Sequence, residues 1–113
     1  MSNSYRVSYS PEARNDLKDI YAYIAYELQA PATAKNQVSR IRKEVRSLDF
    51  MPLRYGLVDW EPWKSLGMHR VSADHFVVFY TVDSDAREVT VIRIVYGGRD
   101  MERLAKSDNE MIP

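Results

Sequence analysis

The chain has 113 residues, of which sixteen are Lys or Arg and sixteen are Asp or Glu, so its formal net charge is zero. Hydrophobic residues make up 45% of the chain and charged residues 28%. This composition excludes disordered and collagen-like proteins and predicts a single globular domain over residues 1–113. No apolar run approaches the length of a membrane span, so we expect no membrane partner.

The absence of cysteine and of a signal peptide narrows the possible classes of protein further. No cysteine is present, which excludes disulfides, thiolate catalysis and sulfur-ligated metals. The first residues, Met1 to Arg6, lack the basic and apolar regions of a signal peptide. We therefore expect a cytoplasmic protein.

Two amphipathic helices are predicted in the first half of the chain, after a short strand at residues 5–9. Ser10 and Pro11 supply a cap and a first-position proline, and the apolar residues that follow at helical spacing predict a helix over about 11–28. Pro31 opens a second helix, whose apolar residues step by four and three: Ala34, Val38, Ile41, Val45 and Leu48. The short connection predicts an antiparallel hairpin.

Three further strands are predicted in the second half, after a loop over residues 49–65. They form an antiparallel meander with turns at 73–74 and 83–87, and they cover residues 66–72, 75–82 and 88–96. The middle strand is apolar on both faces, so we expect it in the centre of the sheet.

The element order β-α-α-β-β-β predicts an α+β fold, in which the helical hairpin packs on one face of a mainly antiparallel four-stranded sheet. The other face is then exposed or covered by another segment. Beyond the last strand we expect a short helix at 99–106 and a frayed tail at 107–113, with the folded core at about 5–104.

Histidine and glycine patterns argue against metal, cofactor and nucleotide sites. Gly97 and Gly98 lack the spacing of a phosphate-binding loop. His69 and His75 lie on neighbouring predicted strands with no third ligand nearby in sequence, which favours ordinary strand histidines over a metal site. We expect no metal and no cofactor.

Arginines are the remaining candidates for chemistry. Arg70 and Arg93 lie on predicted strands and Arg99 follows the glycine pair, where arginines beside a concave sheet face can hold a phosphate and stabilise its charge. Alternatively, Arg70 and Arg93 pair with acidic residues across the strands.

Charge is distributed unevenly along the chain. Residues 35–72 contain eight basic and four acidic side chains, whereas residues 73–113 contain five basic and eight acidic ones. Within the basic stretch, Arg40, Lys43 and Arg46 lie off the apolar stripe of the second helix. They form either a solvated face or a surface for a phosphate or another partner.

Three stretches carry a family resemblance: Tyr5-x-Val7-x-Tyr9-Ser10 with the helix that follows, Arg70 ahead of Phe79-Tyr80-x-Val82, and Val91-x-Arg93-Ile94-x-Tyr96-Gly97-x-Arg99-Asp100. Through these residues the chain resembles the RelE/ParE superfamily of toxins from bacterial type II toxin–antitoxin modules. The resemblance extends over about residues 5–104.

The resemblance implies one of two activities. RelE-like members cut messenger RNA on the ribosome without a metal, whereas ParE-like members poison DNA gyrase and are not nucleases. Arg70 falls where the family has a basic residue, and Arg99 falls where RelE-like enzymes place a catalytic arginine. Glu102 and His75 are the remaining general-base candidates, and neither matches the family by position.

Two departures favour the ParE-like activity. His75-Phe76 stands where the family often has Tyr-Arg, and no Tyr or His follows Arg99. The helical hairpin and the neutral charge also look ParE-like. We therefore expect a growth-arresting gyrase poison, with a RelE-like ribosome-dependent mRNA endonuclease and a non-toxic binding relic as alternatives.

The resemblance also implies partners. We expect a cognate acidic antitoxin, and no specific DNA binding by the toxin alone. The candidate target-binding residues are Arg40, Lys43, Arg46 and Arg93.

Overall fold

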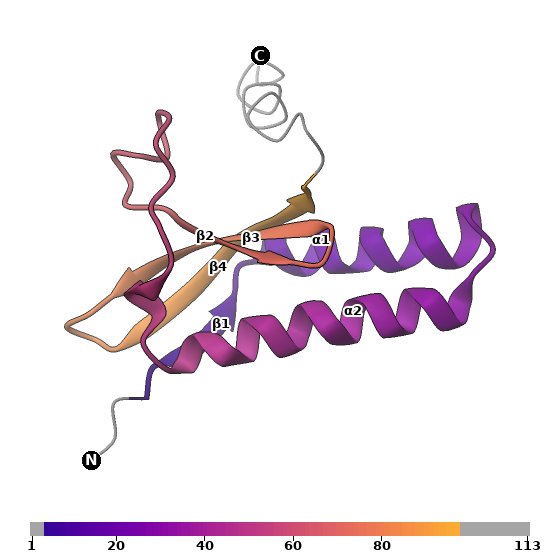
Figure 1. Ribbon diagram of the computed structural model, residues 1–113, viewed down its shortest axis with the longest axis horizontal. Coiled ribbons are helices and arrows are strands. Elements are labelled where there is room, and N and C mark those ends of the chain that lie inside the picture. The colour runs from indigo at the N-terminus through magenta and orange to yellow at the C-terminus, as the bar shows by residue number, and fades with distance from the viewer. Residues whose placement is uncertain (1–3, 98–113) are drawn as a thin grey trace.

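The computed structural model describes residues 4–97, which form two long helices and a four-stranded sheet (Figure 1). The elements are β1 (Arg6–Tyr9), α1 (Pro11–Ala22), α2 (Pro31–Arg46), β2 (His69–Ala73), β3 (Phe76–Asp83) and β4 (Glu88–Tyr96). The predicted α+β fold and element order are confirmed. The short helix expected at 99–106 and the tail at 107–113 lie outside the described residues.

The sheet has the order β1-β4-β3-β2, so β3 lies inside it as its two apolar faces predict. The three later strands form the predicted antiparallel meander, with a bulge in the β3–β4 pairing at Phe79 and Tyr80. β1 pairs in parallel with β4 and places Val7 opposite Val89. The sheet is therefore mixed, with one parallel pair and two antiparallel pairs.

Both helices pack on one face of this sheet. The predicted stripe of α2 is buried there, with Ala34, Ile41 and Leu48 fully inaccessible to solvent. Ser10 ties the start of α1 to β4, because its hydroxyl accepts a hydrogen bond from the Ala13 N–H at 3.0 Å and donates to the Ile92 carbonyl at 2.9 Å. The main core combines residues from both helices and all four strands: Ala13, Leu17, Ile41, Val45, Leu48, Val71, Ala73, Val78, Tyr80, Val89, Val91 and Ile94, with Val7 and Tyr9 packed against them.

The first helix is less regular than its apolar spacing predicts. Its α-helical part ends at Ala22, and Tyr23–Glu27 form a π-helical turn closed by a hydrogen bond from the Leu28 N–H to the Tyr23 carbonyl at 3.0 Å. Tyr23 and Tyr26 are exposed on this turn. Within residues 4–97 we find no helix with the length and apolar character needed to cross a membrane.

The strand predicted from residue 66 begins three residues later, at His69. Residues before it form hydrogen-bonded turns, in which the Lys64 N–H donates to the Trp60 carbonyl and Gly67 has a positive φ of 71°. Gly67 thus ends a turn rather than lying in a strand. The β2–β3 turn also lies one residue later than predicted, at Asp74 and His75, because Asp74 supplies the positive φ that a two-residue hairpin loop requires.

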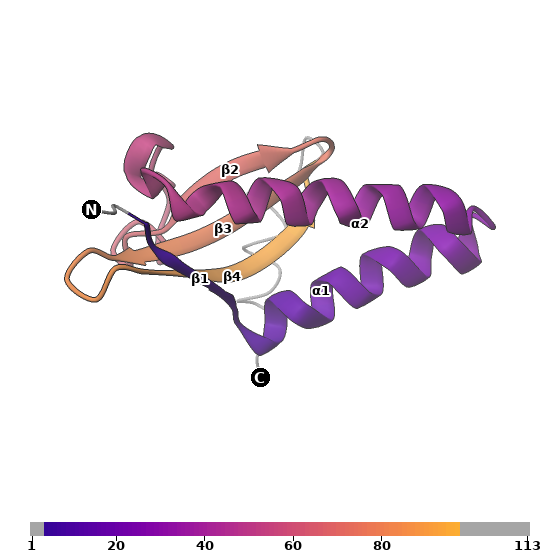
Figure 2. The same cartoon turned by 90° about the horizontal axis from the view of Figure 1, so that it is seen from below.

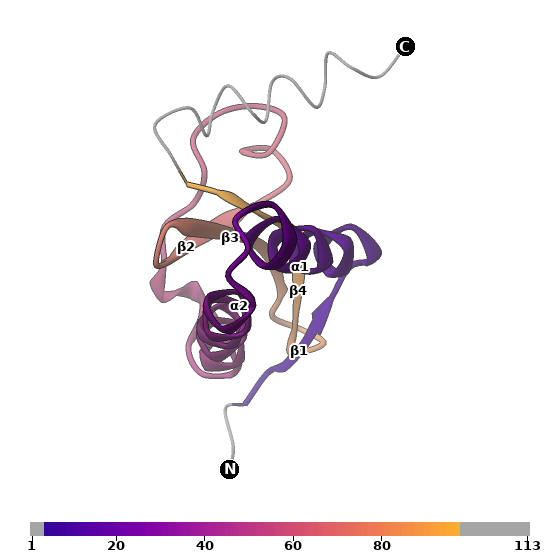
Figure 3. The ribbon, with the colours of Figure 1, turned by 90° about the vertical axis from the view of Figure 1, so that its right-hand side faces the viewer.

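The face of the sheet opposite the helices is covered in part by residues 58–68, on the far side of β2 and β3 from α2 (Figure 3). Val58 and Met68 are buried there against Val77 and Phe79 of β3. The Trp63 ring packs edge-on to Phe79 with 4.5 Å between the ring centroids. A second, smaller core therefore lies beneath a segment that the sequence predicts as a loop up to residue 65 and as the start of a strand from residue 66.

Candidate functional site

The outer edge of β2 is paired only near its start. The Arg70 N–H donates to the Gly56 carbonyl at 3.1 Å, and the Val58 N–H donates to the Met68 carbonyl at 2.8 Å. Because backbone groups alternate in direction along a strand, Ser72 directs its N–H and C=O to the same side as Arg70. Within residues 4–97 these two groups of Ser72 have no backbone partner, so the strand edge is open there.

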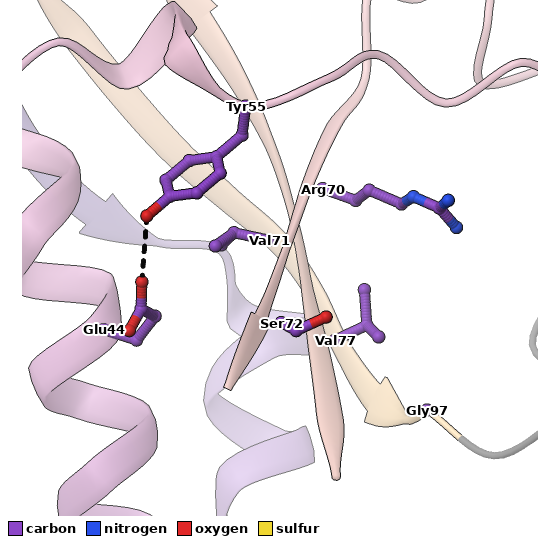
Figure 4. Close-up of a pocket in the computed structure, with 7 residues that line it drawn as sticks. All are labelled: Glu44, Tyr55, Arg70, Val71, Ser72, Val77 and Gly97. Atoms are coloured by element: carbon purple, nitrogen blue, oxygen red, sulfur yellow. Dashed lines mark hydrogen bonds between the residues drawn. The ribbon is translucent and has the colours of Figure 1, made fainter. Parts of the chain in front are cut away.

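A hollow of about 490 Å³ lies at this open edge (Figure 4). Tyr55 and Glu44 lie on one side of β2, while the Arg70 side chain extends on the other side. The hollow is lined by Glu44, Tyr55, Arg70, Val71, Ser72, Val77 and Gly97. We call this surface the β2-edge site.

Arg70 is exposed and lies on the face of the sheet opposite the helices. The residue across the strand pair is Phe79, so the cross-strand acidic partner considered for Arg70 is absent at that position. Its guanidinium carbon lies 5.8 Å from the centre of the Trp60 ring, within range of a cation–π contact. The tryptophan holds Arg70 over the second core while leaving its charge accessible.

Tyr55 and Glu44 are members of the site that the sequence does not single out. The Tyr55 hydroxyl donates to the Glu44 carboxylate at 3.2 Å and accepts a hydrogen bond from Arg54 at 3.2 Å. Arg54 also donates to the carbonyls of Phe50 and Met51, which holds the turn after α2 in place. The arrangement joins a helix to a loop, and no local spacing in the sequence indicates it.

Two of the three cations predicted on α2 also lie at this edge. Arg40 and Lys43 line a hollow of about 430 Å³ next to Tyr55 and Asp74. Arg40 forms an ion pair with Asp74 in the β2–β3 turn, and this hydrogen bond is the main reason that the pKa of Asp74 is lowered. Lys43 therefore adds positive charge to the β2-edge site, while that of Arg40 is balanced by Asp74.

Arg46 lies elsewhere, because six residues of helix place it about 120° around α2 from Arg40. Its charge acts on Tyr9 of β1, as does that of Arg42. The structure thus separates Arg46 from Arg40, and Lys43 lies between them around the helix.

Arg93 is engaged with α1. Its guanidinium donates to both carboxylate oxygens of Asp16, at 2.8 and 3.1 Å, and the Ile94 N–H donates to the same carboxylate at 2.9 Å. Of the two possibilities considered for Arg93, the structure shows pairing with an acidic residue. That residue comes from helix α1 and not from a neighbouring strand. This contact supports the fold and places Arg93 away from the β2-edge site.

The two histidines have separate surroundings. His69 is buried, stacks on Tyr80 with 5.3 Å between the ring centroids, and places its Nδ1 2.9 Å from the Tyr55 carbonyl. His75 is exposed in the β2–β3 turn. The remaining candidates, Arg99 and Glu102, lie outside the described residues.

The sequence matches the family described as the ParE toxin of the type II toxin-antitoxin system, parDE, over residues 7–101. This match covers most of the chain. The protein belongs to this toxin family. The RelE/ParE resemblance is thereby confirmed. A separate search of curated protein sequences found no significant match to the chain.

Solved structures share the fold of this ParE-family toxin. A chain of the chromosomal ParDE system from P. aeruginosa has a TM-score of 0.70 and 21% identity, covering 84% of this chain and 98% of its own. A chain of the RelBE2 toxin–antitoxin complex from Mycobacterium tuberculosis has a TM-score of 0.61 and 18% identity, covering 82% and 98%. A mutant of the E. coli toxin RelE in the free state has a TM-score of 0.61 and 10% identity, covering 96% and 99%. At these identities the similarity establishes the fold alone.

Proposed function

We propose that this ParE-family toxin arrests growth by binding and poisoning DNA gyrase. The observation that carries the proposal is the placement of Arg70. A nuclease needs a general base within hydrogen-bond reach of the reacting hydroxyl. The carboxylate that lines this hollow, Glu44, lies on the other side of β2 from Arg70, whose guanidinium lies over Trp60. An exposed arginine on an aromatic support suits recognition of a protein surface, since arginine and tryptophan are frequent at the centres of interfaces.

The test measures gyrase directly. Purified toxin is expected to inhibit supercoiling by gyrase or to trap cleaved DNA. Arg70→Ala is expected to weaken the effect roughly ten-fold, equivalent to about 1.4 kcal/mol of binding. Arg6→Ala is the matched control, because Arg6 is an exposed arginine on the opposite edge of the sheet. No inhibition at a stoichiometric excess of toxin over gyrase would exclude this target.

The RelE-like alternative depends on residues beyond the described range. It is favoured by the shared fold of RelE structures, and it assigns cleavage to Arg99 and Arg70 with Glu102 or His75 as base. Toeprinting of translated message is then expected to show cleavage in the ribosomal A site, lost in Arg99→Ala. Induced expression without growth arrest would favour the non-toxic binding module over both toxin activities.

We further infer that an acidic antitoxin covers the β2-edge site. The open edge at Ser72 offers backbone groups to an added strand, and Lys43 and Arg70 offer positive charge on either side of it. The similar structures include a ParDE system and RelBE complexes, in which a toxin is paired with its antitoxin. We expect the toxin to co-purify from a cytoplasmic extract with the protein encoded by the neighbouring reading frame. Arg70→Glu is expected to reduce the amount of that protein recovered.

A further inference from the structure

A large hollow lies where the helical hairpin extends beyond the sheet. Figure 2 shows both helices continuing past the end of the sheet at which β2 and β3 are joined. The connected end of the hairpin is closed by a small core of its own, formed by Ile24, Ala25 and Ala34. Between this end and the sheet is a hollow of about 720 Å³, within the roughly 300–1,000 Å³ of small-ligand sites. We call it the hairpin-end hollow.

The walls of this hollow are mostly apolar and include aromatic rings from three elements. Tyr23 comes from the π-helical turn, Phe76 from the start of β3 and Tyr96 from the end of β4. The rings of Phe76 and Tyr96 pack edge to face, with 5.7 Å between their centroids. Tyr23 and Tyr96 are each more than half exposed, so their rings are accessible to a ligand. Such rings bind apolar groups and also attract cations to their faces.

A buried amide of α2 adds a hydrogen-bond acceptor to the wall. Gln37 is only 7% exposed, and its Nε2 donates to the Asp74 carboxylate at 3.1 Å, which fixes the orientation of the amide. The Gln37 Oε1 has no hydrogen-bond partner within residues 4–97. This oxygen is not sealed from solvent, because Trp60 Nε1 is the one side-chain atom in that range that is both sealed and unpaired. A ligand that carries a donor would therefore satisfy Gln37.

Asp19 gives the hollow a negative charge. It lies one helical turn before Tyr23, and it forms no ion pair within the described residues. No Lys or Arg is among the described residues that line the hollow, where His75 is the only basic side chain. Arg40 and Arg93, on the surrounding elements, each form an ion pair with another carboxylate. The charge of the hollow therefore favours a cation.

We propose that the hairpin-end hollow binds a small organic amine, whose ammonium group is carried on an aromatic body. The ammonium group donates to the Asp19 carboxylate and to Gln37 Oε1, while the aromatic body packs among the rings of the wall. An anion would be repelled by Asp19, and an apolar molecule without a donor would leave the Gln37 acceptor unpaired. The inference does not rest on the gyrase proposal, because its test measures only binding at this hollow.

The test is a titration of the isotope-labelled full chain with phenethylamine, followed by the NMR shifts of the backbone amides. The solution is kept at about pH 8, since histidine in general is uncharged there and a charged imidazole would oppose a cation. The shifts are expected at the residues of the hollow, and Asp19→Asn is expected to weaken binding roughly ten-fold. Glu12→Gln is the matched control, because Glu12 is exposed in the first turn of the same helix and loses the same charge. It is expected to weaken binding by less than about two-fold.

Further probes separate charge from apolar contact. Phenethyl alcohol, which lacks the charge, and ethylamine, which lacks the ring, are each expected to bind at least about ten-fold more weakly than phenethylamine. Tyr23→Leu keeps an apolar side chain but removes a ring, and it is expected to weaken phenethylamine binding about three-fold or more.

Four results would overturn the proposal. These are shifts away from the hollow, equal binding to Asp19→Asn and the unmodified chain, equal weakening in Glu12→Gln, and equal affinity for phenethyl alcohol. N-acetyl-lysine amide tests whether the amine belongs to the side chain of a protein partner. Tighter binding of this compound than of phenethylamine would overturn the assignment to a small molecule, whereas weaker binding supports it.

Discussion

Tyr80 links the central strand to the turn after α2. Its side chain is fully buried and its hydroxyl donates to the Pro52 carbonyl at 2.6 Å. Burial raises the pKa of Tyr80 to about 12, from an ordinary value of 10.0. The unfolded chain therefore loses this proton at a lower pH than the folded chain.

The raised pKa predicts a loss of stability in alkali. The contribution of Tyr80 is complete below about pH 10, where both states are protonated, and it falls as the pH rises toward about 12. Tyr80→Phe should cost about 1 kcal/mol at neutral pH through the lost hydrogen bond, and should make unfolding less sensitive to pH in this window. Urea unfolding at a series of pH values measures both effects. An alkaline slope that is the same in both proteins would contradict the assignment.

Gly97 is the last described residue, and β3 leaves no room for a side chain there. A Cβ would lie 2.8 Å from Val77 Cγ2 and 3.1 Å from the His75 carbonyl oxygen, so the strand end would have to move. Gly97→Ala is therefore expected to destabilise the fold by about 1–3 kcal/mol in chemical denaturation. Gly56→Ala is the control, because no atom lies within 4 Å of its added Cβ. Equal stability of the two variants would show that the end of β4 adjusts freely.

At the scale of elements, Asp16 joins α1 to β4. It receives three hydrogen bonds, two from Arg93 and one from the Ile94 N–H, beyond the point where β1 stops pairing with this strand. The carboxylate thus accepts a hydrogen bond from the Ile94 N–H, at a part of the β4 edge that β1 does not reach. Asp16→Ala is expected to cost about 3 kcal/mol, because it leaves Arg93 without that partner in a half-buried position.

The matched control for this prediction is Asp19→Ala on the same helix. Asp19 is exposed and has no ion pair within the described residues, so its removal should change the free energy of unfolding by less than about 0.5 kcal/mol. Thermal or urea unfolding compares the two variants. Similar losses in both would mean that the charge of α1, and not its contact with β4, determines the effect.

Elements with long periodic patterns were predictable from the sequence, whereas the connections between them were not. The stripe from Ala34 to Leu48 and the strand at 88–96 follow directly from apolar spacing. The start of β2 was misplaced because Leu66 continues an apolar pattern through what is a turn at Gly67. The end of α1 was misplaced because the chain continues into a single π-helical turn over Tyr23–Glu27, which contains no proline or glycine to mark the change.

The candidate site was predictable only in part, for a related reason. Arg70 was singled out by its place on a predicted strand and again by the family resemblance, and it is exposed on β2. Tyr55 and Glu44 were not found, because their contact depends on how the turn after α2 folds back. Arg40 and Arg46 were grouped by closeness in sequence, although the helix turns them toward different surfaces.

At the scale of the whole molecule, Arg70 of the β2-edge site and Lys18 of α1 line two different hollows, which share no lining residue. Residues on separate surfaces usually make additive contributions. Lys18→Glu combined with Arg70→Ala is therefore expected to change the free energy of unfolding by the sum of the single effects, to within about 0.5 kcal/mol. Urea unfolding of the two single variants and the double variant checks this, and a larger departure would indicate that the two surfaces are coupled.

The parallel pairing of β1 with β4 also governs when a newly made chain can fold. β1 leaves the ribosome before the other described strands, yet Val7 lies opposite Val89 of β4, which is synthesised much later. A nascent chain that stops before β4 has both helices but no partner for its first strand. The four-stranded sheet can thus form only after β4 has left the ribosome, and until then the nascent chain stays open to proteolysis.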